Sequence, residues 1–365
     1  MKAFKFYLNP IVVKEFRSRM RGWRAFVTLT IYLLFLALFS YGIYKIIVWT
    51  APYTGGMPLS PFIGRALYAA LANLSLFFVA FLTPALTAAA ISSEHERLTL
   101  EMLQATPLAP HTILFGKLIS TASYILLLLF AAVPLASLIF IFGGVTVADL
   151  LLVALVIFGT ALTFGMIGLF FSAWRKRTIQ AIVLSYVVIL AMIGGTYALY
   201  IFWGIMSQDF PPRFILVVNP FSALAAVIAG NGFDTGVSSF FGILAGWGPV
   251  IADNPALVAG LRPLWHYTLA FYLALSTALY LIATRLIKPI RPWRVGWREL
   301  GLVALVAGLY LGGGTTIFYK DIDRALHPPP VTPTPTPVMG LPMPVIQKAP
   351  PPLPTATPAK VENEQ

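Results

Sequence analysis

The residues best suited to chemistry in this sequence gather in one stretch, residues 92–117, which we call the polar island. It reads SSEHERLTLEMLQATPLAPHTILFGK and holds five charged side chains: Glu94, Glu96, Arg97, Glu101 and Lys117. The whole chain is 58% hydrophobic and only 10% charged. A charge cluster of this density therefore indicates a surface that contacts a partner.

Metal binding and hydrolysis are the first chemistries to weigh. The run Glu94-His95-Glu96 offers metal-ligand side chains, but adjacent helix positions point in different directions and no HExxH spacing follows. A solvated helix that faces a partner is the favoured interpretation. Serine, histidine and acid combinations for hydrolysis are not evident, and the sequence has no Gly-x-x-x-x-Gly-Lys-Ser/Thr phosphate loop. We expect no cofactor, no ATP binding and no enzyme activity from this chain by itself.

The elements that position the island are expected to be membrane helices. The mean hydropathy is +0.83, and several apolar runs exceed the roughly 18 to 20 residues that cross a bilayer as a helix. Because these runs are far longer than the ~10 residues of a barrel strand, we predict an all-α integral membrane protein in contact with lipid. The chain has no cysteine, which excludes disulfides and thiolate metal sites. Its net charge of +12 is spaced between apolar runs, which favours membrane topology over nucleic-acid binding.

Seven spans are predicted, each followed by a polar or glycine-rich break. They lie at residues 25–48, 65–92, 112–142, 147–174, 178–206, 266–287 and 300–318. Between the fifth and sixth spans, residues 207–265 are predicted to form external interfacial helices. The apolar part of that segment, residues 221–247, contains Asn231 and Asp234. We interpret it as interfacial or partly re-entrant rather than as a further crossing.

Basic residues orient these spans. If the amino terminus lies in the cytoplasm, the cytoplasmic segments hold most of the 25 Lys and Arg residues, including those of a basic loop at residues 288–299. Residues 1–24 are predicted to form an amphipathic helix on the cytoplasmic surface. Its interfacial anchors are Lys14, Arg17, Arg21, Trp23 and Arg24.

The last part of the chain, residues 319–365, has a different composition. Thirteen prolines fall between residues 328 and 358, so this tail is predicted to be extended or disordered, and outside the cell if seven spans precede it. A solvated spacer is the favoured interpretation. The alternative is a non-transporting membrane anchor or assembly factor whose tail recruits an external partner. An ion-coupled carrier is disfavoured because few charged residues sit deep in any span.

Within the polar island, local signals predict a short rigid helix over residues 94–104. Ser93 and Glu96 fit a capping box at its start, and Thr106-Pro107 would end it. Leu98 and Met102 would form an apolar patch on this helix, surrounded by charged side chains.

The island resembles the first cytoplasmic loop of type 2 ABC-transporter permeases. The residues that carry the resemblance are Glu94, Glu96, Thr99-Leu100-Glu101-Met102-Leu103, Thr106-Pro107-Leu108-Ala109-Pro110 and Gly116-Lys117. Asn9-Pro10 with Lys14-Glu15-Phe16-Arg17, and Asn219-Pro220-Phe221, are similar to two further segments of that family. The seventh span and the proline tail depart from its usual pattern.

The resemblance implies a six-span permease core over residues 25–287 that works with a separate ABC ATPase subunit. ATP would be bound by that partner, and its motion would enter through a coupling helix at residues 94–104. The implied coupling residues are Glu94, Glu96, Arg97, Leu98, Glu101, Met102 and Pro107. The resemblance also implies an exporter in a prokaryotic cytoplasmic membrane, as a homodimer or with a related permease.

Overall fold

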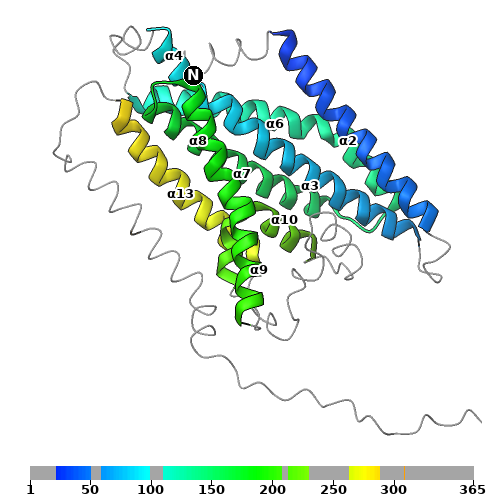
Figure 1. The fold of residues 1–365 in the computed structure, drawn as a ribbon. Coiled ribbons are helices and arrows are strands. Elements are labelled where there is room, and N and C mark those ends of the chain that lie inside the picture. The colour runs from blue at the N-terminus through cyan, green and yellow to red at the C-terminus, as the bar shows by residue number, and fades with distance from the viewer. Residues whose placement is uncertain are drawn as a thin grey trace, which may run out of the picture. The chain divides into compact units, whose positions relative to one another are not determined.

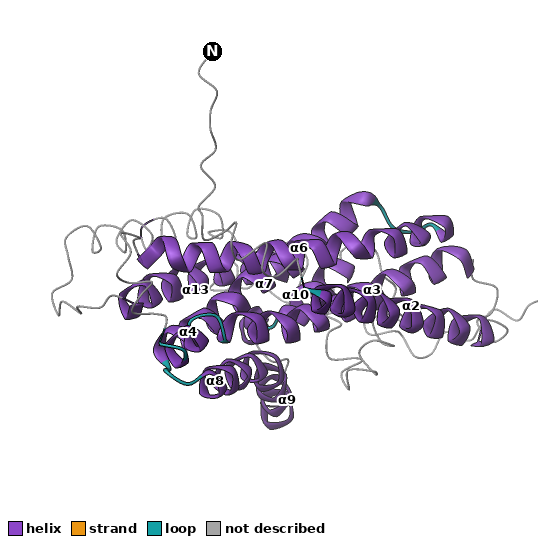
Figure 2. Cartoon of the chain, turned by 90° about the horizontal axis from the view of Figure 1, so that it is seen from above, coloured by secondary structure: helices purple, strands orange, loops and turns teal. Residues whose placement is uncertain are grey.

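A computed structural model describes residues 22–50, 59–98, 110–207, 213–229, 263–287 and 308. Within these ranges the chain is helical apart from short turns, and no strand occurs among them (Figure 2). The helices are α2 (Trp23–Thr50), α3 (Leu59–Ala88), α4 (Ser92–Glu96), α6 (Pro110–Phe142), α7 (Val147–Trp174), α8 (Thr178–Leu190), η2 (Ala191–Gly195), α9 (Thr196–Ser207), η3 (Arg213–Val218), α10 (Pro220–Ala229) and α13 (Leu264–Ile287). The predicted all-α fold class is therefore confirmed.

Six segments are long and apolar enough to cross a membrane. They are Ala25–Trp49, Ser60–Glu96, His111–Phe142, Val147–Trp174, Thr178–Met206 and Leu264–Ile287. They match the first six predicted spans, although the second begins five residues earlier than predicted. The predicted seventh span, the basic loop, the proline tail and residues 1–21 lie outside the described residues, except for Gly308.

The helices α3 and α7 form the centre of the bundle. About half of the apolar stretch of each is buried, at 50% and 56%, against 17% for each of the other four spans. The helices α2 and α6 pack on α3, whereas α13 and α8 pack on α7 (Figure 1). The outer helices consequently present apolar side chains outward, which is the stable arrangement in lipid but not in water.

A tight turn joins α6 to α7. Gly143 and Gly144 have φ angles of 80° and 82°, a region that glycine adopts without steric cost. The next helix then begins with a capping box, in which the Asp149 N–H donates to Thr146 Oγ1 and the Thr146 N–H donates to Asp149 Oδ2 at 2.8 Å. These local signals fix where α7 starts.

The fifth span is one continuous helical segment that contains α8, the π-helical turn η2 and α9 (Figure 1). It is followed by η3 and α10, which are the described part of the predicted external segment. The ten residues of α10 would extend about 15 Å, roughly half of the ~30 Å that a crossing needs. The helix α10 packs on α7 and α13. Residues 230–262 lie outside the described residues, so the interfacial or partly re-entrant position of residues 221–247 stays a prediction.

Candidate functional site

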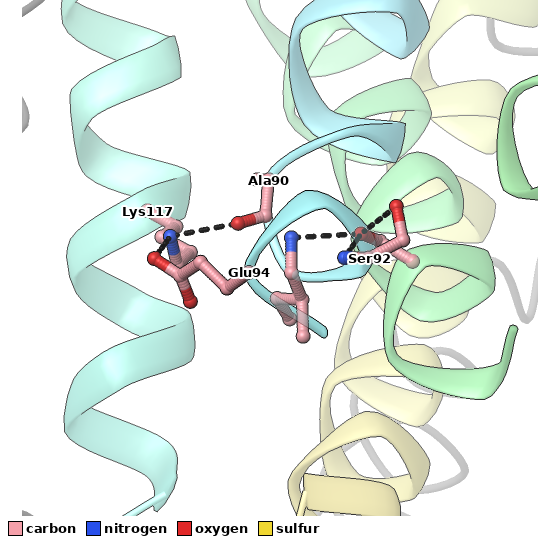
Figure 3. A network of polar contacts seen from close by, with 6 residues as sticks. Ala90, Ser92, Glu94 and Lys117 are labelled. Atoms are coloured by element: carbon pink, nitrogen blue, oxygen red, sulfur yellow. Dashed lines mark hydrogen bonds and ion pairs between the residues drawn. The ribbon is translucent and has the colours of Figure 1, made fainter. Parts of the chain in front are cut away.

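The polar island begins where α3 ends, and its first residues bind directly to the bundle. Lys117 of α6 is almost completely buried and donates from Nζ to Glu94 Oε1 at 2.8 Å and to the Ala90 carbonyl at 2.9 Å (Figure 3). A buried ammonium group is stable only when it is paired and hydrogen-bonded. This contact therefore ties α4 to α6.

The break between α3 and α4 is capped by a side chain from another helix. Ser172 of α7 accepts hydrogen bonds through Oγ from the N–H groups of Ile91 and Ser92, both at 2.9 Å (Figure 3). These donors lie at the start of α4, where a helix leaves N–H groups without partners inside it. The hydroxyl of Ser92 also donates to the Ala88 carbonyl at 2.9 Å. Ser172 thus ties α4 to α7.

The predicted capping box of Ser93 and Glu96 is wrong. The N-cap of α4 is Ile91, which makes no capping side-chain bond, and Ser92 is the first helical residue. Glu96 instead reaches the start of α8, where its two carboxylate oxygens accept from the Thr178 N–H at 2.8 Å and the Thr178 hydroxyl at 2.9 Å. The sequence signal failed because a cap from a distant helix leaves no local pattern.

Glu96 is solvent-exposed and lies at the polar end of a 37-residue apolar segment that is longer than a crossing requires, so it falls outside the membrane. The backbone N–H of Thr178 lowers the pKa of the Glu96 carboxyl, and the Thr178 hydroxyl and Arg177 lower it further. An ionised carboxylate at the amino end of a helix also interacts favourably with the helix dipole. This contact ties α4 to α8.

The predicted continuous helix over residues 94–104 is also wrong in its length. The helix α4 ends at Glu96, and Leu98 adopts a φ of 58°, which an α-helix cannot accommodate. Arg97 and Leu98 are exposed, Leu98 by 74%. The other predicted coupling residues, Glu101, Met102 and Pro107, lie outside the described residues.

The helices beneath α4 are closely packed because α7 carries glycines where it meets its neighbours. A Cβ atom on Gly168 would overlap Oγ1 of Thr87 and approach the backbone nitrogen of Ala88 to 3.1 Å. Gly165 of α7 faces Thr83, which like Thr87 lies on α3, and Gly159 of α7 faces α13. This agrees with the packing role expected for small residues between membrane helices.

Two carboxylates of the Glu94-His95-Glu96 run have partners on different helices, since Glu94 pairs with α6 and Glu96 binds α8. They do not converge on a common point. Lys117 and Ser172 complete the site, but the predicted coupling residues did not include them. The position of Lys117 in an apolar segment was a sequence signal for the site, because a charge there needs an acidic partner. No sequence signal marked Ser172.

The predicted interfacial anchors are only partly described. Trp23 lies at the start of α2 and is 73% exposed. Arg24 lies on the same helix, but its side chain is outside the described part, as are Lys14, Arg17 and Arg21. Their anchoring role stays a prediction.

Six apolar helices and a polar end held to three of them define a multi-pass membrane protein. The sequence model of the family described as "ABC-2 family transporter protein" matches residues 9–284. The chain belongs to this family of transport permeases, which confirms the resemblance to type 2 ABC permeases. Permeases of this family normally work with an ABC ATPase partner and membrane lipids, and they are the membrane subunit rather than the ATP-binding one. Among curated proteins, none matches the chain.

Proposed function

We propose that this permease is the membrane-spanning subunit of an ATP-driven exporter and that α4 with its following residues couples it to a separate ATPase. The observation that supports this best is the set of bonds that join α4 to α6, α7 and α8. A force applied to α4 would reach three membrane helices through polar contacts. A coupling element has to be held in this way, because a loosely attached loop would move without moving the helices.

The contacts support two different roles among the predicted coupling residues. Glu94 and Glu96 are bonded to α6 and α8, so they transmit motion within the permease. Arg97 and Leu98 are exposed at the end of α4 and are the described residues best placed to touch the ATPase. An exposed leucine beside an arginine combines apolar contact with charge, which is typical of protein interfaces. Glu101, Met102 and Pro107 remain predicted contacts.

Co-purification of the ATPase with the permease tests the docking role. Leu98→Asp and Arg97→Glu are each expected to lower the amount of bound ATPase by about tenfold, the effect of losing a central interface contact. Lys45→Glu is the matched control, because Lys45 is an exposed cation on α2, remote in sequence from α4, and the change should leave binding intact. Wild-type binding by both α4 variants would contradict docking at this end of α4.

A second experiment distinguishes the transmission of motion to α8 from the docking of the ATPase. Glu96→Ala removes both hydrogen bonds to Thr178 without changing Arg97 or Leu98. We expect this variant to bind the ATPase normally but to lose the permease-dependent stimulation of ATP hydrolysis. Full stimulation by Glu96→Ala would refute transmission through α8, while leaving docking untouched.

The remaining features of the proposal rest on the sequence. The transporter would act as an exporter, as a homodimer or with a related permease, in a prokaryotic cytoplasmic membrane with the amino terminus inside. Retained ATP-dependent export after deletion of residues 328–365 would reject the alternative in which the proline tail is the main functional element.

A further inference from the structure

The fifth span changes its helical geometry between its two halves. Residues Ala191–Gly195 form the π-helical turn η2, with α8 before it and α9 after it. In a π turn the backbone hydrogen bonds join residues five apart instead of four, so the regular α-helical pattern is interrupted. Such turns recur at functional sites. They are also a recognised cause of helix kinks. The carbonyl groups of this turn are therefore the ones to examine for other donors.

Side chains bind two of these carbonyls. The Thr196 hydroxyl lies 2.7 Å from the Met192 carbonyl and 3.1 Å from the Ile193 carbonyl. Asn219, which is fully buried, donates from Nδ2 to the Ile193 carbonyl at 2.8 Å and to Thr196 Oγ1 at 3.0 Å. Its Oδ1 accepts from the Phe221 N–H at 2.9 Å. The amide of Asn219 thus joins the π turn to the segment that begins α10.

That segment is itself fixed to the sixth span. Tyr272 of α13 is buried and donates to the Val218 carbonyl, one residue before Asn219, at 3.0 Å. The Ser222 hydroxyl bonds the Leu216 carbonyl at 2.6 Å and the Asn219 carbonyl at 2.8 Å. Asn219 is therefore a rigid attachment point for the π turn.

The other half of the fifth span is attached elsewhere. At its start, Thr178 is bound to Glu96 of α4, and further along α8 the Tyr186 hydroxyl donates to the Phe81 carbonyl of α3 at 2.7 Å. The helix α8 is thus tied to α4 and to the helix that leads into it. Among the described residues, the hydrogen bonds that leave this span therefore reach different elements on the two sides: α8 bonds α3 and α4, whereas η2 and the start of α9 bond Asn219. The apolar side chains of α8 and η2 also pack in one cluster with α13.

We infer that η2 is the pivot of the fifth span and that Asn219 is the positioning residue that fixes this pivot. When α4 moves, α8 moves with it, while η3, α10 and α13 hold the far side of the π turn in place. The fifth span then bends at η2 instead of shifting as a rigid rod. This inference rests on the proposed coupling role of α4.

The absence of native cysteine makes a distance measurement direct. Spin labels at Val183→Cys and Ile205→Cys place one probe on each side of η2, at exposed positions of α8 and α9. A control pair at Phe26→Cys and Ile46→Cys has a similar sequence separation on α2, which has no proline or π turn. When the complex with the ATPase partner is trapped with a non-hydrolysable ATP analogue, the distance across η2 is expected to shift. The distance between the two labels on α2 is expected to stay unchanged.

Asn219→Ala tests the positioning role. In the permease alone, reconstituted in nanodiscs, it is expected to broaden the distance distribution across η2, and in the complex it should abolish the shift on trapping. Asn73→Ala is the matched control, because its Nδ2 bonds the Ala69 carbonyl within its own helix α3, and within the described part of the chain no hydrogen bond joins Asn73 to a second element. Should Asn219→Ala fail to fold, Thr196→Val removes the hydroxyl that Asn219 contacts with little change in shape, and the same broadening is expected.

The outcomes separate this inference from the proposed function. A wild-type distribution and a wild-type shift in Asn219→Ala or Thr196→Val would overturn the pivot. An ATPase that binds and is stimulated while the distance across η2 stays constant would also overturn it, and would leave the coupling proposal standing. If no ATPase binds the permease, the coupling proposal fails, and broadening in the permease alone still decides whether Asn219 fixes the turn.

Discussion

At the scale of single residues, the hydroxyl of Ser172 is the simplest contact to remove. Ser172→Ala leaves the N–H groups of Ile91 and Ser92 without the acceptor that each now has at 2.9 Å, in a place where water is excluded. An unsatisfied buried donor costs roughly 1–3 kcal/mol, so we expect the free energy of unfolding to fall by about 2 kcal/mol or more. Thermal unfolding in detergent measures the effect.

Ser185→Ala is the control for this change. Ser185 is equally buried, but its hydroxyl donates to the Ala181 carbonyl of its own helix, a group that regular helix bonding also serves. Its loss should be nearly neutral. Equal unfolding temperatures for the two variants would show that Ser172 does not cap α4.

These residues also show what sequence reasoning reaches and where it stops. Charge density in an apolar chain selected the polar island as the candidate site, because charged side chains are costly in a membrane. It assigned Glu94 and Glu96 to an outside partner, whereas both bind other helices of the same chain. Helical periodicity predicts only which residues are neighbours along one helix. It therefore could not identify Lys117 as the partner of Glu94, or Thr178 as the partner of Glu96, because each lies on another helix.

At the scale of elements, close packing of α7 on α3 is the feature that makes the base of α4 stiff. Gly168→Ala would drive a methyl group into Thr87 and toward the backbone of α3, so the helices must separate. Overpacking of this kind typically costs about 1–3 kcal/mol. We expect a lower unfolding temperature and weaker stimulation of the ATPase, because α3 and α7 would no longer hold α4 firmly.

The double variant Gly168→Ala with Thr87→Ala should recover part of the unfolding temperature and part of the ATPase stimulation, because it removes the Thr87 hydroxyl that the new methyl group would overlap. Gly42→Ala on α2 is the control, since a Cβ atom there would meet no described residue within 4 Å apart from its chain neighbours and the nearby backbone of its own helix. It should leave stability unchanged or raise it slightly, as alanine favours helix over glycine. A Gly42→Ala loss as large as that of Gly168→Ala would contradict the packing explanation.

Element lengths were predictable to different degrees for a physical reason. The six spans follow from the apolar length that a bilayer demands, so their predicted ends differ from the structure by only a few residues. No such constraint sets the length of α4. Its end depends on the backbone of Leu98, and its start depends on Ser172, which lies 80 residues away in the sequence.

At the scale of the whole molecule, the order of the six spans predicts which loops share a side of the membrane. The second and fourth spans must end on the same side, which the bonds between Glu96 and Thr178 independently require. We predict that a cysteine at Lys176 is labelled from the cytoplasm, and that cysteines at Val147 and Phe214 are labelled from outside, because basic loops are retained inside. Membrane-impermeant maleimide on intact and permeabilised cells measures this.

The same labelling decides whether the predicted seventh span crosses. With the amino terminus in the cytoplasm, as proposed, the sixth span would return the chain to the cytoplasm. One further crossing at residues 300–318 would then place the tail outside, whereas an interfacial segment would leave it inside. We expect a cysteine at Thr357 to be labelled in intact cells, together with those at Val147 and Phe214. Labelling of Thr357→Cys only after permeabilisation, in step with Lys176→Cys, would reduce the chain to six spans. The tail would then share a face with the ATPase, and any external partner for it would be ruled out.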